Sequence, residues 1–178
     1  MVDPNYAIKR LLALSSFDAG KNVLRIWSKD EMTYRAFVYY RSPTPQRTSS
    51  PLQMSVRLQK TRITLGDTVR LRVYLLNKEP KLDLLRPLLR IRLPAGLRPL
   101  HWSLKKLKQK RQIDAFETTK RSITLYLDGI KAQKRRVFDI TLQSYVTGHY
   151  RGGASSAYPY YQPSMKAWVA PLKIYIQP

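Results

Sequence analysis

Hydrophobic and polar residues alternate with a period of two along most of the chain after residue 53. Such alternation is typical of a β-strand with one buried face and one solvated face. It occurs in residues 54–59, 69–75, 89–93, 123–127, 138–142 and 174–176. Turn signals such as Leu65-Gly66-Asp67 separate these segments. The pattern predicts an all-β domain, folded as an antiparallel β-sandwich.

One segment departs from this period. Between Trp102 and Arg111, Leu104 and Leu107 are three residues apart among good helix formers. This spacing predicts one short helix that packs on the sandwich through the two leucines, with Ser103 available as its N-cap. Its outer surface would carry the cations Lys105, Lys106, Lys108, Lys110 and Arg111. This basic cluster is either a solvated helix face or a docking surface for an acidic partner.

The first part of the chain has a different character. Residues 42–53 contain three prolines and no hydrophobic period, which predicts an extended linker. Residues 22–27 and 33–40 before it are two further candidate strands. Because a two-stranded hairpin is marginally stable on its own, we expect residues 1–41 to be an incomplete β-domain. Residues 54–178 would form the complete sandwich.

Charge changes this picture less than its size suggests. The 178 residues include 33 Lys+Arg and 11 Asp+Glu, a net charge of +22, which favours polyanions as partners. Five arginines, however, lie on the polar phase of predicted strands and should face water: Arg57, Arg70, Arg72, Arg90 and Arg92. RNP, KH and helix-turn-helix patterns are absent from the sequence. A nucleic-acid-binding or ribosome-associated β-protein therefore stays as the alternative to the interpretation developed below.

The sequence contains little that catalysis could use. It has no cysteine and two histidines, His101 and His149, which lie in different segments, the second in a predicted flexible connection. It has neither an HExxH motif nor a glycine-rich phosphate loop. We therefore expect no enzyme, and no catalytic, cofactor-binding or metal-binding residues. No apolar run approaches the roughly 20 residues needed to cross a bilayer, and no export signal is recognisable in this segment.

The order of several segments is similar to the C-terminal receptor-binding domain of alpha-macroglobulins, particularly the bacterial ones. The similar segments are residues 65–70, 89–100 with their Pro-Ala-Gly-Leu turn, the lysine-rich helix, 123–130, 157–163 and Trp168 with 172–176. In that family a split CUB-type domain, interrupted by a thioester domain, precedes the receptor-binding domain. The resemblance implies that residues 1–21 leave the thioester domain, that residues 22–41 are the returning CUB-like strands, and that the chain is a C-terminal fragment or a truncated reading frame.

The resemblance also implies a function. Alpha-macroglobulins are broad-spectrum inhibitors that trap proteases, and many carry an internal Cys-Gly-Glu-Gln thioester. This chain has no cysteine and cannot hold one. It would be a non-catalytic C-terminal module whose partners are the other domains of an extracellular or periplasmic parent, with proteases reached only through that parent.

A possible recognition surface follows from the same resemblance. In vertebrate members, two lysines at the start of the short helix carry receptor recognition. His101 and Lys105 occupy those two positions here, so one of the two lysines is kept. The implied recognition helix, for a receptor or an acidic surface, has these candidate residues: His101, Lys105, Lys106, Lys108 and Lys110.

Overall fold

A computed structural model describes residues 23–35 and 50–178. The chain divides into two units, Met1–Tyr40 and Arg41–Pro178, and each is described by itself. In the first unit, residues 23–35 adopt no helix or strand, and large side chains such as Val23, Leu24 and Trp27 are exposed. The predicted strand at residues 22–27 is therefore not formed over residues 23–27, since no pairing strand lies beside them in the described segment. Residues 36–40 lie outside the described residues, and an incomplete β-domain at residues 1–41 stays a prediction.

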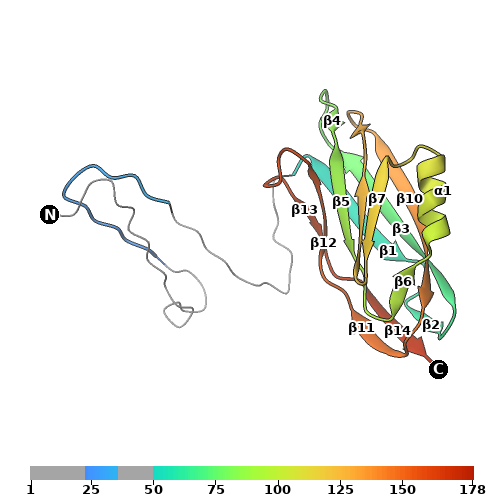
Figure 1. The fold of residues 1–178 in the computed structure, drawn as a ribbon. Helices are drawn as coiled ribbons and strands as arrows, with labels where there is room; N and C mark the ends of the chain where they lie inside the picture. Colours follow the sequence, from blue (N-terminus) through green and yellow to red (C-terminus); the bar gives the residue numbers. More distant parts are fainter. Residues whose placement is uncertain (1–22, 36–49) are drawn as a thin grey trace. The chain divides into compact units, whose positions relative to one another are not determined.

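The second unit is a β-sandwich of two main sheets (Figure 1). One sheet has the strand order β1-β3-β10-β6, and every pair in it is antiparallel. Its strands are β1 (Leu52–Leu58), β3 (Thr68–Asn77), β10 (Arg135–Ser144) and β6 (Leu97–Pro99). The short helix α1 (His101–Gln109) follows β6 and packs beside β10.

The facing sheet has the order β13-β12-β5-β8-β7 and is also antiparallel throughout. Its strands are β13 (Ala167–Val169), β12 (Ser155–Pro159), β5 (Pro87–Arg92), β8 (Ser122–Tyr126) and β7 (Ala115–Thr119). The two main sheets confirm the all-β sandwich with one short helix that the hydrophobic pattern predicted.

Two small sheets complete the domain. At one end, β14 (Lys173–Gln177) lies between β11 (Gly148–Arg151) and β2 (Arg62–Thr64). The pair β4 (Leu84–Leu85) and β9 (Gly129–Ile130) forms the other sheet. β14 runs parallel to β2, and this one pair departs from the antiparallel arrangement that the sequence predicted. His149 lies on β11, which makes the predicted flexible connection at that position wrong, because β11 is paired along its length with β14.

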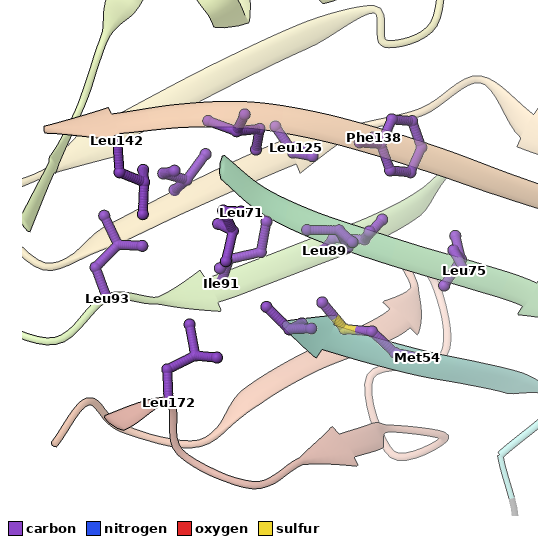
Figure 2. Packing of buried hydrophobic residues seen from close by; sticks show 14 of the residues in the cluster. Met54, Leu71, Leu75, Leu89, Ile91, Leu93, Leu125, Phe138, Leu142 and Leu172 are labelled. Atoms are coloured by element: carbon purple, nitrogen blue, oxygen red, sulfur yellow. The ribbon is translucent and has the colours of Figure 1, made fainter. Parts of the chain in front are cut away.

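The core fills the space between the two main sheets. Leu71 of β3 and Ile91 of β5 have no exposed surface, and Figure 2 shows their side chains lying together with those of neighbouring strands. Phe138 of β10 is among the largest fully buried side chains. Along β3 and β10, buried residues alternate with exposed or half-buried ones, which places the hydrophobic phase inside.

The domain begins earlier than the sequence indicated. β1 starts at Leu52, inside the predicted linker of residues 42–53, because Leu52 continues the buried phase of Met54 and Val56. Ser50 is also buried, and its hydroxyl donates a hydrogen bond to the carbonyl of Met165 at 2.9 Å. Residues 42–49 lie outside the described residues.

The strand arginines occupy the outer faces, as predicted. Arg57, Arg70 and Arg90 are exposed, and Arg92 is half-buried. Arg72 is half-buried too, and its guanidinium forms a two-point ion pair with Asp139 at 2.7 and 2.9 Å.

Candidate recognition surface

Helix α1 is held on the sandwich by three buried side chains. Leu104 and Leu107 are buried, as the spacing predicted. Ser103 is buried beside them, and its hydroxyl donates to the carbonyl of Leu100 at 2.8 Å and accepts from the backbone N–H of Thr141 at 3.1 Å. This side chain therefore joins the helix to β10.

The predicted role of Ser103 as N-cap is wrong. Leu100 occupies the cap position in an extended conformation, with no side-chain hydrogen bond to the helix. The helix begins at His101, three residues before the start that a cap at Ser103 would give. The backbone of Leu100 is fixed by β10, because its N–H donates to the carbonyl of Thr141 at 2.9 Å.

The C-terminal end of α1 has the hydrogen bonds of a Schellman motif. The N–H of Gln112 donates to the carbonyl of Leu107 at 3.0 Å, and that of Arg111 donates to the carbonyl of Lys108 at 2.9 Å. Arg111 has a positive φ of 54°, the left-handed conformation that usually selects glycine at this position. Arg111 therefore lies just beyond the helix, whereas Lys106 and Lys108 lie in its last turn, where the helix dipole favours cations.

The candidate residues form two rows on the exposed side of the helix. His101, Lys105 and Lys108 follow one another at spacings of about one turn, and so do Trp102, Lys106 and Lys110. All four lysines are exposed, and so are His101 and Trp102. The structure thus brings the five predicted site residues onto one surface, which we call the lysine-helix surface and define as His101, Lys105, Lys106, Lys108 and Lys110.

Within the described residues, the lysine-helix surface takes part in no ion pair. The ion pairs found among the described residues are Arg72–Asp139 and Lys131–Asp83, and neither involves the helix. The first turn of α1 contains no acidic residue either. Lysines three or four residues apart repel one another, so this surface would gain from a negatively charged partner.

The two histidines lie apart on different elements. His101 begins α1 with its ring centroid 6.2 Å from that of Phe116, whereas His149 stacks on Tyr175 at 4.1 Å. In residues 23–35 and 50–178, no three His, Asp or Glu side chains lie close enough together to hold a metal ion. Among the described residues, no helix has the length and apolar character that crossing a bilayer requires.

Sequence reasoning missed a cluster of arginines at the end of β5. Arg92, Arg121 and Arg151 line one hollow, although they lie about 30 residues apart in the sequence. No local motif connects them. The only sequence signal was that residues 140–178 contain no Asp or Glu.

Comparison with known proteins identifies the fold. Residues 87–170 match the model of the A-macroglobulin receptor binding domain. This part of the chain is a receptor-binding domain of the alpha-macroglobulin family. The matched stretch runs from β5 to the end of β13 and includes α1, so the lysine-helix surface belongs to the receptor-binding domain.

Solved structures of bacterial alpha-2-macroglobulins have the same fold as this receptor-binding domain. Native Escherichia coli alpha-2-macroglobulin matches with a TM-score of 0.63 and 14% identity, over 76% of this chain and 10% of that one. Salmonella alpha-2-macroglobulin reacted with methylamine gives 0.62 and 14%, over 75% and 10%. The E. coli protein activated by porcine elastase gives 0.62 and 16%, over 75% and 14%. The chain thus spans 10–14% of these proteins, and a search of curated sequences found no match.

Proposed function

We propose that this chain is the non-catalytic C-terminal module of an alpha-macroglobulin-like inhibitor that traps proteases outside the cytoplasm. The observation that carries the proposal is the match of residues 87–170 to the receptor-binding domain. The module would pack against other domains of the parent chain and leave protease capture to them. Its large buried core and the absence of cysteine are consistent with a structural role.

The lysine-helix surface is the part of this module that we propose for recognition. Its lysines are exposed and have no ion-pair partner among the described residues. Charges presented on a rigid, well-packed helix steer and orient an oppositely charged partner. An acidic receptor or an acidic face of the parent chain would fit this surface.

Protease trapping is tested on the complete polypeptide, including any coding sequence that continues in frame upstream. After incubation with elastase, we expect cleavage of a large protein substrate to fall, while cleavage of a small peptide substrate persists, because a cage excludes only large molecules. Elastase whose active site is already blocked serves as control and should not be captured. A stop codon directly upstream, or equal cleavage rates with and without the polypeptide, would contradict the proposal.

The recognition surface is tested separately by charge reversal. The variant K105E/K106E/K108E/K110E should lose binding to the acidic parent domains, and the loss should shrink as salt screens the wild-type interaction. The matched control K60E/K78E/K81E/K134E reverses four exposed lysines elsewhere on the domain, none of which forms either ion pair. Equal losses of binding in both variants would show that total charge, rather than the helix, determines binding. The same measurement with an oligonucleotide in place of the parent domains tests the nucleic-acid alternative.

A further inference from the structure

Three arginines surround a hollow of about 390 Å³ that the lysine-helix surface does not include. Arg92 ends β5, Arg121 lies in the turn between β7 and β8, and Arg151 ends β11. Trp168 of β13 forms an apolar wall, and its side chain is 40% exposed. We call this hollow the arginine pocket.

A pair of glycines gives the arginine pocket its floor. A Cβ atom on Gly152 would lie 3.1 Å from the backbone nitrogen of Pro94 and 3.2 Å from the carbonyl oxygen of Arg92. A Cβ atom on Gly153 would lie 3.4 Å from Cγ of Arg92. Glycine at position 152 therefore lets the connection between β11 and β12 approach the end of β5. At position 153 a methyl group would make ordinary contact with the stem of Arg92, which glycine leaves uncovered.

A second hollow of about 340 Å³ has Arg151 in its lining as well. Lys173 also lines it, directly opposite Arg151 in the pairing of β11 with β14. Beside them, the ring of Tyr175 stacks on His149, and the guanidinium of Arg62 lies 5.4 Å from the centroid of the same ring. Arg62, Tyr175 and His149 are register partners across three strands.

The charged side chains that line the two hollows are all positive. No Asp or Glu lines either of them. Arg151 and Lys173, directly opposite each other in the pairing of β11 with β14, bring two cations together, and an anion has the complementary charge. Guanidinium groups match oxyanions in two-point geometry, so carboxylate, sulfate or phosphate groups are the chemistry that the hollows fit.

We propose that the two hollows form one binding site for an acidic oligosaccharide. Successive sugar units would place their oxyanions on Arg92, Arg121 and Arg151, and then on Lys173, with one ring against Trp168. Single-stranded nucleic acid fits less well, because it needs successive free aromatic faces for its bases, whereas Tyr175 is already stacked on His149 and approached by Arg62. The proposal goes beyond protease trapping and does not depend on it.

The test uses the 178-residue chain with Trp168 as its only tryptophan. The variant W27F/W102F removes two exposed tryptophans, so Trp168 alone reports binding through its fluorescence. Hexasaccharides bearing carboxylate, sulfate or phosphate are compared with a neutral hexasaccharide, and with polyphosphate and an oligonucleotide of equal charge. We expect saturable changes with an acidic hexasaccharide, none with the neutral one, and binding of the two non-saccharide polyanions at least about tenfold weaker. Equal affinity for all polyanions would overturn the proposal.

Matched variants distinguish binding at this site from a general effect of net charge on binding. In the same background, R92Q/R121Q/R151Q should weaken binding at least about tenfold, because charge-assisted contacts are lost. The control K105Q/K106Q/K108Q removes as many charges from the lysine-helix surface and should change binding by less than about threefold. G153L keeps every charge but covers the stem of Arg92, and should also weaken binding.

Circular dichroism and thermal unfolding verify that each variant is folded. If the triple arginine variant or G153L is not folded, R121Q replaces it, because Arg121 is exposed in a turn. Unchanged binding by R121Q and by every folded pocket variant, or equal weakening by the arginine and lysine variants, would reject the site.

Discussion

Gly96 is the residue at which backbone conformation and packing are most tightly coupled. Its φ is +85°, and a Cβ atom there would lie 2.6 Å from Cε2 of Tyr150 and 2.9 Å from Cδ1 of Ile176. We predict that Gly96→Ala lowers the free energy of unfolding by about 2–5 kcal/mol, the sum of left-handed strain and overpacking. Urea denaturation measures this difference.

Gly66 provides the control for that prediction. It has a similar φ of +88°, but a Cβ atom there would meet nothing within 4 Å. Gly66→Ala should therefore cost only the conformational part, about 1–2 kcal/mol. Equal losses at the two positions would mean that Tyr150 and Ile176 do not resist the added methyl group.

Asp139 makes stability depend on pH. Its hydrogen bonds with Arg72 lower the pKa of its carboxyl below the ordinary value of 3.8, so the folded state holds this proton less tightly than the unfolded state. The contribution to stability is complete above that ordinary value and is lost as the pH falls through the lower folded pKa. We predict that Asp139→Asn is slightly less stable than the wild type at pH 7, because the exposed pair is screened by water.

The pH profile decides whether charge is responsible. The difference in free energy of unfolding between wild type and Asp139→Asn should shrink as the pH falls below about 4. A difference that stays constant down to low pH would assign the effect to hydrogen-bond geometry instead. Chemical denaturation at a series of pH values gives both curves.

Among the elements, α1 ends in a way that a single substitution can improve. Arg111 adopts φ 54° at the position of the Schellman motif where glycine is preferred. Arg111→Gly should raise the free energy of unfolding by about 0.5–1 kcal/mol, because left-handed conformations strain residues that have a Cβ atom. Gln109→Gly, two residues earlier at the last position of the helix, should lower it by up to about 1 kcal/mol. Thermal unfolding distinguishes the two signs, and a loss in both variants would contradict the cap assignment.

The elements also show what the sequence could predict and what it could not. Strands β3, β5 and β10 were recognisable because each faces a core on one side and water on the other. Strand β12 was missed because its buried side chains include Ser155 and Ser156, and Ser155 accepts a hydrogen bond from the N–H of Arg92. Strand β7 is an edge strand with no buried residue.

Of the two candidate sites, the sequence could predict one and could not predict the other. The lysine-helix surface was predictable because its residues are close in sequence and one helix presents them all. The arginine pocket was not, because Arg92, Arg121 and Arg151 come from three strand ends that only the folded topology brings together. Ser103 was misjudged for a similar reason: its partner Thr141 is 38 residues away.

At the scale of the whole molecule, the net charge of +22 should oppose folding. Few carboxylates offset it, and only two ion pairs occur among the described residues. We predict that the melting temperature rises between about 10 mM and 150 mM NaCl, as the Debye length falls from about 30 to 8 Å. The variant K105E/K106E/K108E/K110E, whose net charge is +22 − 8 = +14, should show a smaller rise. A melting temperature that falls with salt in the wild type would contradict this account.

The position of β14 has a consequence for synthesis of the protein. β14 is the last strand of the domain, yet it is the middle strand of its sheet, and both of its neighbours, β2 and β11, are made before it. While the ribosome still holds residues 173–177 in its exit tunnel, β2 and β11 lack their common partner, and Gly96 lacks contact with Ile176. This end of the sandwich can therefore close only after residues 173–177 have left the exit tunnel, and until then its open strand edges are exposed to other chains.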